Sequence, residues 1–310
     1  MRKIVKDVTE LPKSTDMIVI ASYHKGTLLP RFKNTFMYLN DACFDCPVVL
    51  FLQDKKDVEL YSWVQEEIIF WCPEEPELTD LAKVRWFIQT RLTEYGVRIL
   101  TLLDDDMRFA WRSLPEEPTN YVQLNDSCCP SLNHKSTTGD STYYFSDFMY
   151  SARELLVNKE RIVCVSMPSR FGSSGIVNDQ INKRAICVFV LDLQKLKEHN
   201  VVFDPFQILM SDFEFDCAIA YAGLQTYCIA EYVRDGRENS KDPGGCNEYR
   251  TEKKELYETM TKRLCNRYPE VIASFFDNKN GYVSGGVIAP KMNWKMLDIV
   301  SEKIWSINNE

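Results

Sequence analysis

Short apolar runs alternate with helix-like stretches through the first third of the chain, and this alternation is its strongest constraint on the fold. Each run is rich in β-branched or aromatic residues, as is typical of buried strands. The runs are Met17–Ser22, Pro47–Gln53, Glu67–Trp71 and Val97–Leu103. Helices are expected over Asp57–Glu66 and from Thr79 or Asp80 to Tyr95, where Gly96 ends the second one. Strands separated by helices of this length predict βαβ units and a mostly parallel sheet.

The rest of the chain continues this pattern with longer insertions. Further strands are expected at Ile162–Met167, Ala185–Leu191 and Gln225–Tyr232, and further helices at Asp147–Lys159, Asp212–Tyr221 and Glu252–Arg267. Residues 113–142 and 168–183 are rich in small polar residues, which indicates loops. There is no internal repeat and no linker, and 310 residues suffice for a large core. We expect one α/β domain over residues 1–310, with a Rossmann-type, mostly parallel sheet flanked by helices.

Composition narrows the classes of function. Hydrophobic residues make up 45% of the chain, which excludes a disordered or fibrous protein. The 45 acidic residues outnumber the 37 Lys and Arg residues, and the formal net charge is −8. Because indiscriminate binding to nucleic acids depends on Lys and Arg, this charge argues against such binding. It does not exclude a local basic groove.

The cysteines and the termini indicate a cytoplasmic protein. Eleven cysteines are an odd and scattered set, and several lie in strand-like runs, as expected of buried thiols in a reducing compartment. Cys43 and Cys46 form a lone CxxC without the second pair of a zinc ribbon. No apolar run approaches the roughly 20 residues of a membrane span, and the N-terminus lacks the apolar core of a signal peptide. We expect no contact with membranes.

Three adjacent acids, Asp104, Asp105 and Asp106, follow the fourth predicted strand directly. Adjacent carboxylates repel one another, and a cation at the mouth of a sheet relieves that repulsion. Mg²⁺ and Mn²⁺ prefer such hard oxygen ligands, and Mg²⁺ typically takes one or two carboxylates plus substrate phosphates. Because side chains alternate along a strand, Asp104 and Asp106 are expected to point to the same side. The alternative is a solvated acidic loop.

A strand-end Asp-x-Asp after alternating βα structure resembles the nucleotide-sugar glycosyltransferases of GT-A fold. The resemblance implies that Asp104 and Asp106 hold a divalent cation, Mn²⁺ or Mg²⁺, against the donor diphosphate, and that Asp104 and Asp105 contact the donor. Many members add a late histidine ligand, which is missing here because the histidines are His24, His134 and His199. The cation then relies on the diphosphate and water, or on another acid such as Asp242.

A second acidic motif of that fold has its counterpart downstream. Inverting GT-A enzymes often carry an acidic pair at the start of a helix and a glycine further on, and here Ser211-Asp212-Phe213-Glu214 and Gly223 resemble that pattern. The resemblance implies that Asp212 is the general base and that Glu214 is a neighbouring catalytic candidate. Ser211 departs from the pattern, which has an acid there. The alternative is an acid-rich helix start favoured by the helix dipole.

Several short motifs narrow the resemblance to the TET/JBP-associated glycosyltransferases, mostly of bacteriophages. They are Ala21–Lys25, Arg85-Trp86, Leu103–Phe109 with Arg112, and Pro243–Thr251. Together they touch residues 17–251. The resemblance implies transfer of glucose or arabinose from a UDP-sugar to 5-hydroxymethylcytosine in phage DNA, in the host cytoplasm, as a means of evading restriction.

The remaining candidates divide between donor and acceptor. The donor candidates offer a stacking ring, cations for phosphate, or backbone N–H groups: Tyr23, Lys25, Arg85, Gly244 and Gly245. The candidates for contact with the acceptor DNA are Arg112, Arg170, Phe171, Tyr249 and Arg250. Their alternatives are surface charge, ordinary packing or, for residues 243–251, a flexible Gly-rich loop.

Residues 1–112 are expected to form the nucleotide-sugar-binding half, and residues 143–310 the acceptor-binding half with C-terminal helices. Two other functions remain open. One is a UDP-sugar glycosyltransferase with a protein or glycan acceptor, which the acidic charge favours. The other is a glycosyltransferase-like module that binds DNA or nucleotide without turnover.

Overall fold

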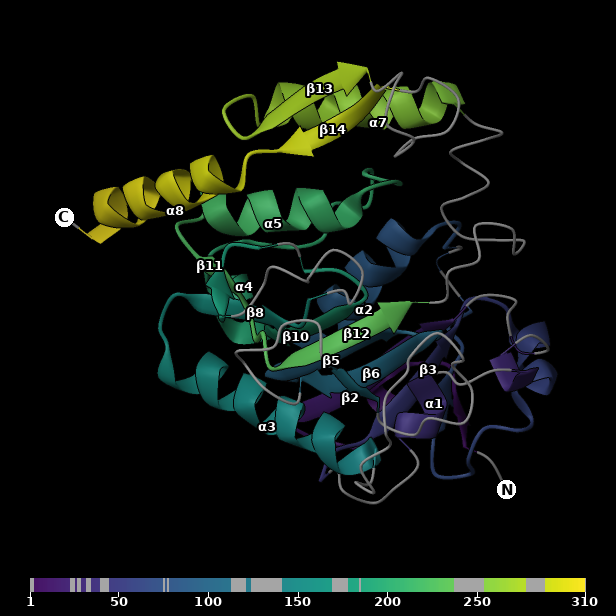
Figure 1. The fold of residues 1–310 in the computed structure, drawn as a ribbon. Coiled ribbons are helices and arrows are strands. Elements are labelled where there is room, and N and C mark those ends of the chain that lie inside the picture. Colours follow the sequence, from purple (N-terminus) through teal and green to yellow (C-terminus); the bar gives the residue numbers. More distant parts are fainter. Residues whose placement is uncertain are drawn as a thin grey trace.

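A central sheet of nine strands organises the computed structural model of the chain (Figure 1). The structure describes residues 3–22, 26, 29–31, 35–39, 45–74, 76, 78–112, 121–123, 141–168, 178–183, 185–236, 254–276 and 288–309. Within these residues, no helix is long and apolar enough to cross a membrane.

The central sheet has the order β1-β4-β3-β2-β5-β10-β8-β11-β9. Its strands are β1 (Ile4–Val5), β2 (Asp16–Ser22), β3 (Val48–Leu52), β4 (Ile69–Trp71), β5 (Ile99–Asp104), β8 (Ile162–Ser166), β9 (Gln180–Ile181), β10 (Val188–Asp192) and β11 (Gln225–Cys228). The first five strands in this order are parallel, β10 is antiparallel to β5 and β8, and β8 is parallel to β11. The predicted mostly parallel sheet is confirmed. The carboxyl ends of β2, β5 and β8 therefore share one edge.

Two small sheets lie outside the central one. One has the order β12-β6-β7, with β6 (Met107–Arg112), β7 (Tyr121–Gln123) and β12 (Tyr232–Gly236), and the other pairs β13 (Ile272–Phe276) with β14 (Ile288–Met292). The predicted strand over 225–232 was wrong in one respect, because the chain leaves the central sheet after Cys228 and enters the small sheet at Tyr232. This crossing brings β12 beside β6, which begins directly after the three acids.

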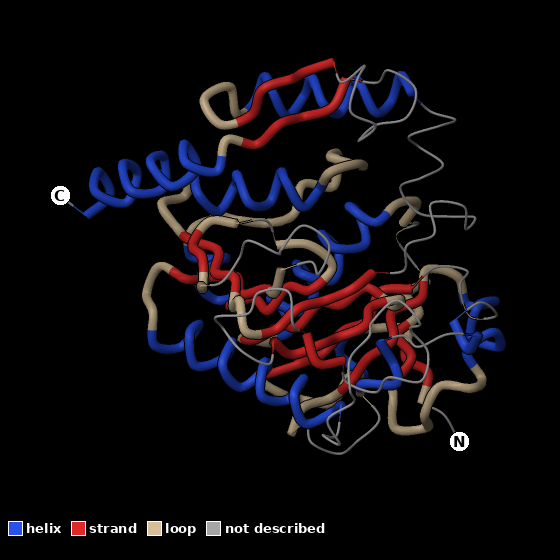
Figure 2. Tube along the Cα trace, viewed as in Figure 1, coloured by secondary structure: helices blue, strands red, loops and turns tan. Residues whose placement is uncertain are grey.

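Alternate strand residues supply two cores, one on each face of the sheet. Helices lie on both sides of the strands (Figure 2). Met17 and Val19 face α2 (Leu81–Tyr95), α4 (Leu193–Glu198) and α5 (Ser211–Tyr221). Ile18 and Ile20 face the other core, which includes residues of α1 (Thr35–Tyr38) and α3 (Ser141–Asn158). Strands buried on both faces read as continuous apolar runs, which is why the sequence identified them.

The predicted caps of α2 are confirmed, whereas two other predicted helices differ in type or in their first residue. The Asp80 carboxylate accepts from Lys83 N at 3.0 Å, and Gly96 closes α2 at φ 95°. The helix expected over 57–66 is instead a 3₁₀ helix, η3 (Lys55–Tyr61), and two shorter ones are η1 (Val8–Glu10) and η2 (Leu29–Arg31). The helix expected from Asp147 begins earlier, at Ser141.

The C-terminal elements form a further layer against α5. Helices α7 (Lys254–Arg267) and α8 (Trp294–Asn309), with the β13–β14 hairpin, lie on the side of α5 away from α3 (Figure 1). Arg161 fastens α8 to the sheet, since Nη1 donates to both Glu302 carboxylate oxygens at 2.8 Å and Nε donates to Gly223 O at 3.2 Å. One end of α5 is therefore held between the sheet and α8.

Replacing Gly223 by Ala is expected to destabilise the fold through α8. Gly223 has φ 78°, and a Cβ there would lie 3.0 Å from Trp305 N in the backbone of α8. Gly96 provides the matched control, because its φ is also positive but a Cβ there meets nothing within 4 Å. Gly96→Ala should cost only the conformational term of about 1–2 kcal/mol, and Gly223→Ala should cost more. Urea denaturation of both variants measures the difference, and equal losses would contradict the role of α8.

Candidate functional site

The three acids, Asp104, Asp105 and Asp106, lie in a tight turn at the carboxyl edge of the sheet, the acid turn. Asp104 is the last residue of β5, Asp105 and Asp106 make the turn, and β6 follows. The buried residue Thr35 fixes this turn. Its Oγ1 donates to Asp104 O at 2.5 Å and accepts from Met107 N at 3.0 Å, and its N donates to Asp105 O at 3.2 Å.

The middle acid is turned into the protein. Asp105 is buried, and its carboxylate accepts a hydrogen bond from Ser22 Oγ, which also bonds Tyr61 OH. Asp104 and Asp106 remain partly exposed, and the Asp104 side chain keeps 24% of its surface accessible. Asp105 is thus held by Ser22 of β2, which Tyr61 of η3 supports, while the acids on either side of it stay partly exposed. Its contact with a donor stays a prediction.

Arg85 connects the acid turn to the start of α5. It lies on α2 and is only 4% exposed. Its Nη2 donates to Asp104 Oδ1 at 3.1 Å, and its Nη1 donates to Ser211 Oγ at 3.1 Å. The guanidinium also stacks over the Phe189 ring, 4.9 Å from its centroid. Two motifs more than a hundred residues apart in sequence are thereby placed side by side.

Asp212 lies in the first turn of α5 and is 6% exposed. Met210, at φ 60°, precedes the helix in the left-handed region and turns the chain into it. Burial acts to lower the pKa of Arg85, but the charges of Asp104, Cys187 and Asp212 outweigh it and raise that pKa. Asp104 and Asp212 therefore both lie within electrostatic reach of one buried cation. Of the predicted site residues, the structure brings together Asp104, Arg85 and Asp212.

Glu214 makes its contacts with α7 rather than with the acid turn. Its Oε1 accepts from Tyr268 OH at 2.9 Å and lies 3.0 Å from Arg267 Nη1. Arg267 and Arg263 also each reach Asp204 Oδ2 at 2.6 Å. Burial raises the pKa of Glu214. These contacts favour a residue that joins α5 to α7, and its catalytic role stays a prediction.

The other predicted residues fall outside what the structure describes. For Arg112 the backbone is described in β6 but the side chain is not. The residues that lie outside the described ranges are Tyr23, Lys25, Arg170, Phe171, Gly244, Gly245, Tyr249 and Arg250.

Sequence reasoning missed several residues that build this edge of the sheet. Thr35, Ser22 and Tyr61 fix the acid turn, and Arg234 on β12 is a second buried arginine nearby. A single threonine, serine or tyrosine carries no signal in a sequence. Arg234 carries none either, because it lies between Val233 and Asp235 in a stretch that already contains the charged Glu231.

The acid turn has the chemistry of a partial cation site. Its donors are hard carboxylate oxygens, and Asp104 and Asp106 are the partly exposed pair. Across the described ranges no three His, Cys, Asp or Glu residues are grouped so as to hold a metal. The pair therefore fits a cation that takes most of its ligands from a bound phosphate and water, as Mg²⁺ commonly does.

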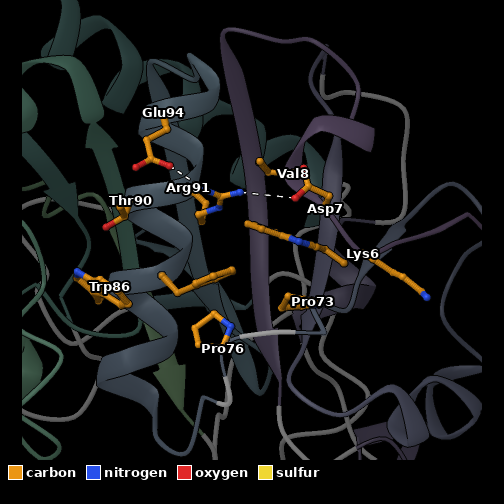
Figure 3. A pocket seen from close by; sticks show the side chains of 11 residues that line it. Lys6, Asp7, Val8, Pro73, Pro76, Trp86, Thr90, Arg91 and Glu94 are labelled. Carbon is orange, nitrogen blue, oxygen red and sulfur yellow. Dashed lines mark hydrogen bonds and ion pairs between the residues drawn. The ribbon is translucent and has the colours of Figure 1, made fainter.

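A separate cavity of about 530 Å³ lies between α2 and the chain that follows β1 (Figure 3). Trp86 and Arg91 line it from α2, and Asp7 and Pro73 line it from the facing segments. Arg91 Nη1 bonds Glu94 at 3.0 Å, and Nη2 lies 3.6 Å from Asp7. None of the predicted site residues lines this cavity, so it is distinct from the acid turn.

Replacing Glu214 by Gln is expected to change how stability depends on pH. Because the pKa of Glu214 is raised above its ordinary 4.5, the folded protein keeps a proton that the unfolded chain has already lost. The stability that this proton confers is full below pH 4.5 and is lost as the pH rises to the raised pKa. Gln does not ionise, so the free energy of unfolding of E214Q relative to the wild type should increase over that range.

Urea denaturation at a series of pH values measures this difference. The exposed Glu94, replaced by Gln, is the control. A difference between E214Q and the wild type that stays flat with pH would contradict the effect of burial.

Known proteins match the chain in structure but not in sequence. No family model matches it, and no curated protein matches it. The mannosyltransferase PcManGT from Pyrobaculum calidifontis, solved with GDP-Man and Mn²⁺, is similar over 98% of this chain and 72% of its own, with 12% identity and a TM-score of 0.49. TarS from S. aureus is similar over 82% of this chain, with 7% identity and a TM-score of 0.44. Our chain spans about 40% of the length of TarS. The likeness to these proteins is one of fold alone.

Proposed function

We propose that the chain is a metal-dependent glycosyltransferase that takes its sugar from a nucleoside diphosphate sugar. The observation that carries this proposal is the pair of hydrogen bonds from Arg85 to Asp104 and to Ser211, next to Asp212. Transfer of a sugar needs a site for the donor diphosphate and a base for the acceptor hydroxyl. The motif at Asp104–Asp106 resembles the donor site, and the motif at Ser211–Glu214 resembles the site of the base. Arg85 lies between these two motifs and bonds both.

In this proposal Asp104 and Asp106 hold Mn²⁺ or Mg²⁺ together with oxygens of the diphosphate. A cation held by these two carboxylates would offset the negative charge of the diphosphate leaving group. Asp212 accepts the proton of the acceptor hydroxyl as that oxygen bonds to the anomeric carbon. The bond from this carbon to the diphosphate oxygen breaks, and its electron pair leaves with the diphosphate. Because the acceptor oxygen attacks opposite the departing diphosphate in a single displacement, the configuration at the anomeric carbon is inverted.

For the substrates, we propose a UDP-sugar with glucose or arabinose, and 5-hydroxymethylcytosine in DNA as the acceptor. The short motifs that resemble the TET/JBP-associated glycosyltransferases support this choice. The proposed donor half is residues 1–112 and the proposed acceptor half is residues 143–310. With a net charge of −8, DNA would be held by a confined basic rim, and its binding would weaken steeply with salt.

Replacing Asp212 by Asn is expected to lower transfer by about 10²- to 10⁴-fold, the usual contribution of a general base, while UDP-sugar binding stays unchanged. Asp106→Asn is the matched variant, since it removes one carboxylate of the proposed cation site and should lose Mn²⁺-dependent donor binding. Binding is measured by calorimetry, and turnover by release of UDP. Loss of transfer in E214Q but not in D212N would assign the base to Glu214, and a wild type that binds no UDP-sugar would overturn the proposal.

Mass spectrometry of DNA tests the acceptor. DNA containing 5-hydroxymethylcytosine, incubated with the protein, Mn²⁺ and a panel of UDP-sugars, should gain the mass of one hexose or one pentose per modified base. Unmodified DNA of the same sequence is the control. UDP-sugar turnover without any gain of mass on DNA would instead favour a protein or glycan acceptor.

A further inference from the structure

Arg234 is a buried arginine at the same edge of the sheet, and the proposed function leaves it without a role. It lies on β12, opposite Phe109 of β6, the third residue after Asp106. Its backbone N donates to Pro168 O at 3.0 Å, just past the carboxyl end of β8. Because β5 and β8 run in the same direction, these contacts hold Arg234 at the edge that carries the acid turn.

The charge of Arg234 has no acidic partner among the described residues. Arg234 is 5% exposed, and its Nε, like the Nε of Arg85, is buried without an acceptor. The other buried arginine, Arg85, is paired with Asp104 at 3.1 Å. Burying a charge is costly unless it is paired, so a guanidinium without a carboxylate in this position needs an anion.

Asp104 and Arg234 both act electrostatically on the Cys187 thiol. Cys187 O accepts from Asp104 N at 2.9 Å. Burial, followed by the charge of Asp104, raises the pKa of the Cys187 thiol, whereas Arg234 and Arg85 act to lower it. Asp104 and both arginines are therefore within electrostatic reach of this thiol. Arg85 already has its acid, whereas Arg234 has none within the described ranges.

We propose that Arg234 binds a phosphate group of the donor diphosphate, beside the cation at Asp104 and Asp106. This inference rests on the proposed function. A guanidinium suits the role because its planar fork matches two phosphate oxygens. When the bond between the anomeric carbon and the diphosphate oxygen breaks, Arg234 stabilises the charge that develops on the departing phosphate. The donor phosphate in turn supplies the anion that the buried Arg234 guanidinium lacks among the described residues.

Replacement of Arg234 by Met tests this role by calorimetric titration with UDP and with GDP in the presence of Mn²⁺. Met keeps much of the side-chain volume and removes the charge. The affinity for the nucleotide that the wild type binds should fall about 10- to 100-fold, as expected for loss of a charge-assisted bond. Arg234→Lys, which keeps the charge but loses the fork, should fall in between. Arg91→Met, in the cavity of Figure 3, is the matched control and should bind like the wild type.

Thermal unfolding separates binding from a structural role. Since Arg234 has no acidic partner in the described part of the chain, R234M should melt at or above the wild-type temperature without nucleotide and should lose most of the UDP-induced increase. A lower melting temperature of R234M without nucleotide, or unchanged UDP affinity, would overturn the inference and leave the proposed function standing. A wild type that binds neither UDP nor GDP with Mn²⁺ would overturn both. Weaker binding of DNA with unchanged binding of UDP would assign Arg234 to an acceptor phosphate and also overturn the inference.

Discussion

The hydrogen bonds of Arg85 hold together the parts of this protein that carry its chemistry. An arginine on α2, buried against the Phe189 ring, reaches Asp104 at the end of β5 and Ser211 at the start of α5. Each of these elements belongs to a different part of the chain, and each is positioned by its own core packing. Without the guanidinium, no side chain in the described ranges would join Asp104 of β5 to Ser211 of α5. The rest of the site depends on this pairing.

The two buried arginines at this edge differ in what satisfies them. Arg85 is neutralised within the protein, so its geometry is fixed before any ligand binds. Arg234 is almost as deeply buried and lacks an acid among the described residues, and we have proposed that a substrate phosphate supplies it. In such a site Arg85 keeps its position with or without a ligand, whereas Arg234 gains its counter-charge only when the ligand is bound. Arg85 therefore positions the acids, and Arg234 provides affinity for a negatively charged ligand.

The sequence predicts the sheet well because β2, β3, β5, β8 and β10 are buried on both faces and read as apolar runs. The sequence predicts β6 poorly. This strand lies in a small separate sheet, and its residues mix charged and apolar side chains instead of forming one apolar run. The 3₁₀ helix at Lys55–Tyr61 has the charged composition of an α-helix, and composition alone does not distinguish the two. Within the site, the three adjacent acids Asp104–Asp106 could be recognised from the sequence. The pairing of Arg85 with Asp104 and Ser211 could not, because it depends on how α2 and α5 pack.

The attachment of α8 through Arg161 has a consequence for the order in which this protein can fold. Arg161 and Glu302 are 141 residues apart, and Arg85 and Ser211 are 126 apart. Contacts of such long range form late, because much chain must be ordered before they can close. During synthesis, α5 gains its support from α8 only after residue 302 has left the ribosome. The nascent chain therefore contains Ser22 and Thr35, which bond the acid turn, before the helix α5 is secured by α8.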